Sequence, residues 1–182
     1  NLDRVKATTG DVYLSTTGSL LASQQDTPAN VVGRYINLSA LNGTIGTVSE
    51  PLDLDSSFSG TSKVDAVAKN VVVLTERTGD QPVGAITSNL SNVHLFAANS
   101  IVDADNDSAS DVNGNDIHLT AQNGTIGVSS NDLEINTHFS GGSLLDAHAT
   151  GDIFITETTE FLHVDNAVSD SGNIRLTVNE TS

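Results

Sequence analysis

Cysteine, methionine and tryptophan are absent from this chain of 182 residues, and proline occurs only three times. Without cysteine the protein forms no disulfide and carries no thiol chemistry, which is compatible with a secreted bacterial protein. Aromatic residues make up only 4% of the sequence, so a core has to be built from Val, Ile, Leu and Ala. No apolar run reaches the length of about 18 residues that a membrane-spanning helix needs.

Basic residues are also scarce. Seven Lys and Arg stand against 23 Asp and Glu, which gives a formal net charge of -16. A field of this sign repels nucleic acid and anionic lipid headgroups, so we expect no nucleic-acid partner and no membrane insertion. It suits an extracellular surface in a cation-rich medium. The chain opens at Asn1 in a polar stretch without a signal peptide, which favours an excised or processed fragment.

The residues that are present favour strands and tight turns. Val, Ile and Leu supply most of the apolar side chains, and Thr, Ser, Asn, Asp and Gly fill most of the remaining positions. Branched side chains suit a pleated surface, whereas Asn, Asp and Gly suit turns. The composition therefore predicts an all-β protein.

A long internal repeat is the strongest feature of the sequence. The run Asn42-Gly43-Thr44-Ile45-Gly46 recurs 81 residues later, and at this fixed offset about 30 of roughly 101 aligned pairs are identical without a gap. The match indicates a duplication within one segment, 1–182, with units at about 12–92 and 93–173 and partial units at both ends. Further matched runs are Phe58-Ser59-Gly60 with Phe139-Ser140-Gly141, Asp65-Ala66 with Asp146-Ala147, and Thr75-Glu76 with Thr156-Glu157.

A shorter period lies inside the long one, because strands with apolar residues two apart recur about every 20 residues. Taking one such strand per coil, we predict a parallel β-helix (β-solenoid) of about nine coils of roughly 20 residues, in 81-residue superrepeats. Right-handed coiling follows the strong preference of parallel crossovers. The strands are expected to start near Val12, Ile36, Leu52, Val72, Val93, Ile117, Leu133, Ile153 and Ile174.

Alternation within these strands predicts which side chains form the core. Val12 with Leu14, and Ile36 with Leu38, would point inward. Ile45 and its match Ile126 would be the next inward residues after an Asn-Gly turn.

Tandem immunoglobulin-like sandwiches are the competing fold, because a unit of about 81 residues is close to the length of one such domain. Three features favour the β-helix. The repeat has an internal period near 20, no Trp or Tyr stands where a sandwich core has its aromatic anchor, and no Pro-rich linker separates the units.

The run from Gly114 to Gly127, Gly-Asn-Asp-Ile-His-Leu-Thr-Ala-Gln-Asn-Gly-Thr-Ile-Gly, resembles the repeats of filamentous-haemagglutinin-like adhesins. The stretches at 151–156 and 172–177 are similar. These adhesins are very large bacterial exoproteins built from β-helix repeats. The resemblance covers nearly the whole chain through short, degenerate motifs. It implies localisation at the bacterial cell surface and a role as an adhesive or spacing shaft.

One acid-rich stretch is a candidate metal site. Asp103, Asp105 and Asp107 place three carboxylates at alternate positions, which could surround a calcium ion. The stretch is not an EF-hand, because Ser108 and Gly114 stand where that loop needs Gly and Glu. The matching residues of the first unit are Ala22, Gln24 and Asp26, so the cluster does not belong to the repeat.

No catalytic constellation is recognised, and we expect that the protein is not an enzyme and needs no cofactor other than possible calcium. Asp65 and Asp146 recur, as do Glu76 and Glu157, and recurrence in both units is explained better by coil geometry than by one catalytic centre.

The leading hypothesis is a non-catalytic structural segment, a stiff shaft or self-associating rod of a surface adhesin or extracellular filament. Its partners would be neighbouring repeats or further copies stacked end to end, together with host or matrix glycans or proteins. The alternatives are an extracellular glycan- or calcium-binding module and a degraded polysaccharide-active enzyme.

Overall fold

The computed structural model describes residues 1–23, 28–57, 61–137, 142–159 and 161–179. Gln24, Asp26 and the two Phe-Ser-Gly motifs lie outside the described residues. Within these ranges the regular elements are strands, and none is a helix. The strands are β1 (Val5–Lys6), β2 (Val12–Thr16), β3 (Val31–Val32), β4 (Tyr35–Ala40), β5 (Leu52–Asp55), β6 (Lys63–Ala68), β7 (Val72–Glu76), β8 (Gln81–Ser88), β9 (Val93–Ala97), β10 (Ile101–Asp103), β11 (Val112–Asn113), β12 (Ile117–Ala121), β13 (Leu133–Asn136), β14 (Leu145–Ala149), β15 (Ile153–Glu157), β16 (Val164–Ser169) and β17 (Ile174–Val178).

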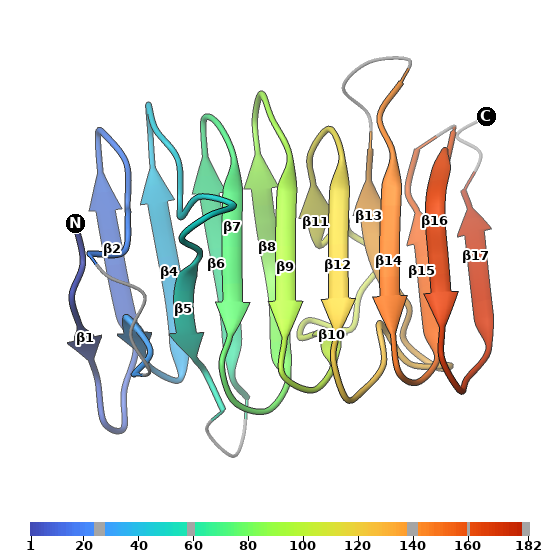
Figure 1. Cartoon of the computed structure of the whole chain (residues 1–182), viewed down its shortest axis with the longest axis horizontal. Helices are drawn as coiled ribbons and strands as arrows, with labels where there is room; N and C mark the ends of the chain where they lie inside the picture. Colours follow the sequence, from blue (N-terminus) through green and yellow to red (C-terminus); the bar gives the residue numbers. More distant parts are fainter. Residues whose placement is uncertain (24–27, 58–60, 138–141, 160, 180–182) are drawn as a thin grey trace.

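The strands form two parallel sheets that face each other along one axis (Figure 1). One sheet has the order β1-β3-β5-β7-β9-β12-β14-β16, and the other runs from β2 through β4, β6, β8, β11, β13 and β15 to β17. The chain alternates between the sheets, so it winds as a β-solenoid of about seven turns. Parallel pairing throughout these sheets confirms the predicted fold class and excludes tandem immunoglobulin-like sandwiches, whose strands are antiparallel.

The expected nine short coils are corrected to about seven longer turns. The turns also differ in length: Val64 is in register with Ile36 on one side and with Val83, which is much nearer in the sequence, on the other. The nine strands recognised in the sequence belong to both sheets, because strands of either sheet show the same alternation. Some of the spacings between successive expected strands therefore correspond to half a turn of the solenoid, and others to a full turn.

The duplication spans three and a half turns, so matched positions lie in opposite sheets. Strand β2 belongs to the nine-stranded sheet and its match β9 to the eight-stranded one, whereas the reverse holds for β5 and β13. Local contacts are kept despite this exchange. The Ser19 hydroxyl accepts a hydrogen bond from the Thr44 N–H at 3.1 Å, and Ser100 accepts one from Thr125 at the same distance.

The core is a stack of aliphatic rows between the sheets. Ile36, Val64 and Val83 succeed one another in register and are fully buried. Ile45 and Ile126 are also 0% exposed, as predicted. Burial of each such side chain stabilises the fold by about 1.5–3 kcal/mol, so these rows, which continue along the axis, hold the turns together.

Glycine is required at one corner of each copy. Gly46 and Gly127 have φ of 65° and 64°, and a Cβ on either would lie 2.3 or 2.2 Å from the carbonyl oxygen of Val73 or Phe154. Both the left-handed backbone and the close approach exclude a side chain.

A buried glutamate caps the backbone at another corner. The Ser56 N–H and hydroxyl donate to the Glu76 carboxylate, and Thr137 donates in the same way to the matching Glu157. The repeated glutamates thus serve the coil geometry. Burial raises the pKa of Glu76 to about 7, and the Ser56 hydrogen bonds oppose this shift.

Substitution of the corner glycine is expected to destabilise the solenoid. Gly127→Ala should lower the free energy of unfolding by at least about 2 kcal/mol, because the left-handed φ and the clash add. Gly10→Ala is the matched control, since nothing lies within 4 Å of its Cβ position, and it should cost less than about 0.5 kcal/mol. Urea denaturation measures both. Equal losses would contradict this account of the corner.

Glu76 is expected to make stability fall as the pH rises. Its folded pKa of about 7 exceeds the ordinary value of 4.5, so the folded state holds the proton more tightly. This contribution is complete below about pH 4.5 and is lost as the pH rises through 7. The loss amounts to about 3 kcal/mol.

Glu76→Gln stays neutral at every pH, so in urea titrations between pH 4.5 and 8 its stability should fall by about 3 kcal/mol less than that of the wild type. Ser56→Ala removes a hydrogen bond that lowers the pKa of Glu76, so it should move the decline to higher pH. Parallel stability curves for the wild type and Glu76→Gln would show that Glu76 does not titrate in this range.

Candidate cation site

The site lies where the chain leaves the nine-stranded sheet and returns to it. Strands β10 and β11 both pair with β8: Asp103 is in register with Val83, and Val112 with Ile86. Residues 104–111 form a loop between these two strands. One turn further on, β13 pairs with β11 and carries Glu134. The loop therefore begins and ends beside the next turn of the same sheet.

Three carboxylates meet at this position. Asp103 ends β10, Asp111 directly precedes β11, and Glu134 lies on β13. One oxygen from each lies within 4.8 Å of those of the other two. The residues are 8%, 3% and 8% exposed. Carboxylate oxygens are the ligands that hard divalent cations prefer, and this is the one such group of acids among the described residues.

Backbone contacts fix two members of the group. Asp111 donates its N–H to the Glu134 carbonyl at 2.9 Å, and the Glu134 N–H donates to Asp111 Oδ2 at 3.0 Å. Ile86 donates its N–H to the Asp111 carbonyl at 2.7 Å. These bonds tie the carboxylates to two successive turns of the sheet.

Burial disfavours the charged form of this group. Desolvation raises the pKa of Asp111 to about 9, with the Asp103 and Glu134 charges adding to the shift. Desolvation, followed by the charge of Asp103, raises the pKa of Glu134 to about 7. A cation between the carboxylates would offset both effects, and without one the group tends to hold protons.

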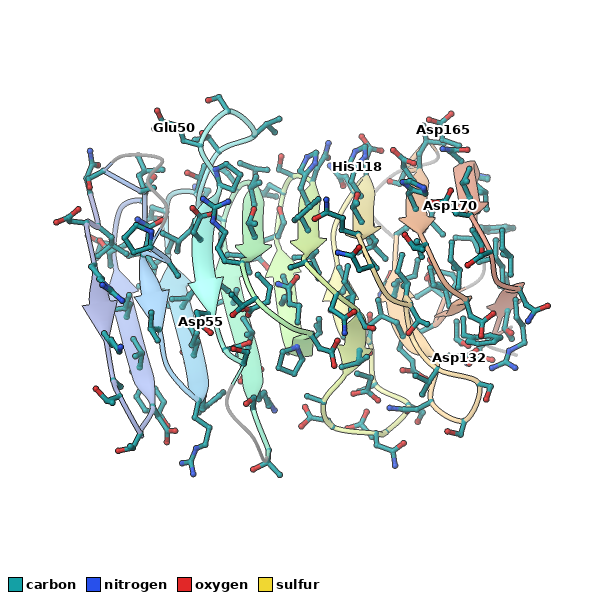
Figure 2. All side chains as sticks on the ribbon, turned by 60° about the horizontal axis from the view of Figure 1, so that its bottom comes forward. Glu50, Asp55, His118, Asp132, Asp165 and Asp170 are labelled. Atoms are coloured by element: carbon teal, nitrogen blue, oxygen red, sulfur yellow. The ribbon has the colours of Figure 1, made fainter. Side chains whose placement is uncertain are left out.

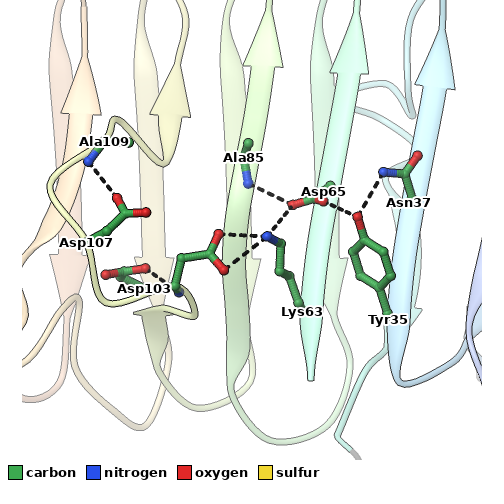
Figure 3. Close-up of polar contacts among 9 residues, drawn as sticks. Tyr35, Asn37, Lys63, Asp65, Ala85, Asp103, Asp107 and Ala109 are labelled. Atoms are coloured by element: carbon green, nitrogen blue, oxygen red, sulfur yellow. Dashed lines mark hydrogen bonds and ion pairs between the residues drawn. The ribbon is translucent and has the colours of Figure 1, made fainter. Parts of the chain in front are cut away.

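Among the described residues, Asp103, Asp105 and Asp107 are not a group whose carboxylate oxygens all lie within 4.8 Å of one another. Figure 3 shows separate hydrogen bonds for Asp103 and Asp107. Asp103 Oδ1 accepts the Asp105 N–H at 2.7 Å, while the Asp105 carboxylate reaches Lys63 Nζ at 2.7 Å. Asp107 is exposed and accepts the Ala109 N–H at 2.6 Å. The calcium site on these three residues stays a prediction, and the geometry assembles a different set that shares only Asp103.

Lys63 lies at the centre of a surface network beside the loop (Figure 3). It pairs with Asp105 and, at 3.8 Å, with Asp65. Asp65 also accepts hydrogen bonds from the Tyr35 hydroxyl and the Ala85 N–H. The Asp105 hydrogen bond raises the pKa of Lys63, and the Asp65 hydrogen bond raises the pKa of Tyr35. Asp105 is therefore already matched with a cation of the chain.

Three of the described histidines form contacts between turns, two of them with Asp146 and Asp170. His118 Nδ1 lies 3.4 Å from Asp146, and His148 Nε2 lies 3.1 Å from Asp170. The rings of His94 and His118 stack at 4.3 Å. Figure 2 shows His118 and Asp170 on the outside of the solenoid. These groups are spread along the surface rather than gathered around one point.

Sequence reasoning does not single out Asp111 and Glu134. The alignment of the two copies does contain a signal for the group, because Asp111 stands where the first copy has Asn30, and Asp103 where it has Ala22. Their closeness to one another, however, follows from the length of the turn. That length is only known once the strands are assigned to sheets.

In the described part of the chain, no helix has the length and apolar character that crossing a bilayer requires. Comparison with known proteins gives no significant match, whether to a family model, a curated protein or a solved structure. What the chain does therefore has to be argued from its own residues and fold.

Proposed function

We propose that this chain is a non-catalytic structural segment, a stiff rod that belongs to a bacterial surface adhesin or extracellular filament. The observation that carries the proposal is the continuity of both sheets from the first turn to the last (Figure 1). About seven turns, stacked about 4.8 Å apart, give a rod about 34 Å long.

The interior supports a mechanical role. Its buried rows are aliphatic, and aliphatic side chains lie in register with aliphatic side chains of the neighbouring turns. In such a stack the hydrogen bonds of both sheets run parallel to the rod axis, so bending or stretching the rod strains many of them at once.

The final turn offers a surface for stacking. Ile174 is in register with the fully buried Ile153, and Val164 with the fully buried Leu145, yet they are 45% and 42% exposed. Within the described residues, β2 and β17 are the outermost strands of their sheet, and as parallel strands they run in the same direction. The last turn of one molecule therefore complements the first turn of another, and this head-to-tail contact does not close on itself.

The acids considered for polysaccharide cleavage have structural partners. Asp65 is bound by Tyr35 and Ala85, and Glu76 is bound by Ser56. This favours a structural role over a hydrolase centre at these positions. Secretion to the cell surface rests on the resemblance of the repeats to those of filamentous-haemagglutinin-like adhesins.

The purified chain is expected to associate end to end, and more so at high salt, because salt screens the repulsion of its net charge of -16. Sedimentation velocity and negative-stain microscopy, with salt raised in steps, should show rods whose lengths are multiples of about 34 Å. Monodisperse single rods at every salt concentration would contradict self-association.

Ile174→Lys should suppress this association, since it places a charge on the exposed inward row of the last turn. Val48→Lys is the matched control. It makes the same change at a side chain that is 68% exposed but lies in the turn after Gly46, away from both ends. Thermal unfolding checks that both variants fold. Equal association of the two variants would place the contact elsewhere.

A further inference from the structure

Two corners of the solenoid are related by the duplication, and they differ in charge. The second corner carries the buried acids Asp103, Asp111 and Glu134. The matching residues of the first corner are, in the same order, Ala22, Asn30 and Asp53.

Among the described residues, one backbone N–H hydrogen bond is kept at both corners. In the first, the Asp53 N–H donates to Asn30 Oδ1 at 3.1 Å. In the second, the Glu134 N–H donates to Asp111 Oδ2 at 3.0 Å. At this contact the two corners can be compared directly, because the hydrogen bond is kept while the side chains differ.

The first corner contains its own cation. Arg77 Nε lies 3.1 Å from Asp53 Oδ2, and Asn30 and Ala22 add no charge. At the second corner Thr158 stands in place of Arg77. Its hydroxyl donates to the Ile135 carbonyl at 3.1 Å. Relative to the first corner, the second has gained two acids and lost the guanidinium.

No cationic side chain of the described chain forms an ion pair with any of the three acids. Asp103 Oδ2 and Glu134 Oε2 are buried and have no hydrogen-bond partner among the described residues. Burying an ionised oxygen without a partner is costly. Two such atoms in one group of carboxylates indicate a bound cation.

The ligand set favours calcium over other cations. All the donors are oxygens, which excludes a preference for zinc or copper. Ca²⁺ holds oxygens at about 2.3–2.6 Å, so ligands across the ion lie up to about 5 Å apart. The three oxygens lie within 4.8 Å of one another, close enough for one ion to contact all of them. Mg²⁺ usually keeps several waters and is held by one or two carboxylates, so three carboxylates suit calcium better. Water can complete the coordination from the loop side, where residues 105–109 are exposed.

We propose that Asp103, Asp111 and Glu134 bind one calcium ion, which takes the role that the Arg77 guanidinium has in the first copy. The ion joins the start and the end of the 104–111 loop to the next turn of the sheet. The site is independent of end-to-end stacking, so either proposal can fail without the other.

The test begins with the full chain, stripped of metal and titrated with calcium chloride near neutral pH. Isothermal titration calorimetry should show one saturable site per chain, with a Kd between about 10 µM and 1 mM. At a calcium concentration about 100 times Kd the Tm should rise by roughly 5 °C. Magnesium should bind at least about tenfold more weakly.

Three variants carry the first corner's residues into the second. Asp103→Ala and Asp111→Asn should each weaken calcium binding at least about tenfold and still fold, because these residues already occupy the matching positions of the same frame. Thr158→Arg should abolish calcium binding and raise the Tm in the absence of calcium. If the acids had only a structural role, Thr158→Arg would not replace calcium binding with a higher Tm in the absence of calcium.

The control is the double variant Asp105→Asn with Asp107→Asn, which removes loop carboxylates and leaves the buried group intact. It should bind calcium as the wild type does. Loss of binding in this variant, with Asp111→Asn unaffected, would move the site to the loop and overturn the proposal. Absence of a saturable calcium site in the wild type would overturn it as well, because protons alone would then neutralise the acids.

Discussion

Each inner strand of the two sheets hydrogen-bonds in register to a strand of the turn before it and to a strand of the turn after it. This requirement governs the rest of the structure. An inward side chain rests on the inward side chains of those neighbours, so Ile36, Val64 and Val83 form one continuous row. The connections between strands carry no such constraint, and successive turns therefore differ in length. Functional side chains can therefore be placed in the connecting loops without a change in the core.

The fold class can be predicted from the sequence more directly than the length of each turn or the sheet to which each strand belongs. Alternation at Val12, Ile36 and Val93 predicts strands with one buried face, and the long internal repeat predicts stacked, similar turns. Alternation does not reveal to which sheet a strand belongs. Val72 and Val93 are neighbours in one sheet, while Ile117 and Leu133 lie in different sheets. The coil length was underestimated for this reason, although the class of fold was not affected.

The buried acids show the same limit on a smaller scale. The acid-rich stretch of sequence suggests that Asp103 acts together with Asp105. In the structure, however, Asp105 forms an ion pair with Lys63, which lies on a strand much earlier in the chain. Glu134 reaches Asp111 because Val112 and Ile135, on strands one turn apart, are in register. A shorter turn would have placed a different side chain there. Proximity between turns depends on loop lengths, which residue patterns alone do not give.

Matched positions of the two copies lie in opposite sheets, and this has a consequence for any chain that repeats the long unit. Each unit advances about 17 Å along the axis and turns the next one to the other side, because three and a half turns stack at about 4.8 Å each. A surface feature present in every unit would then lie on opposite sides of the rod in successive units, and copies on the same side would be about 34 Å apart. Tandem duplication of one gene segment would therefore give the rod two opposite rows of identical surface features.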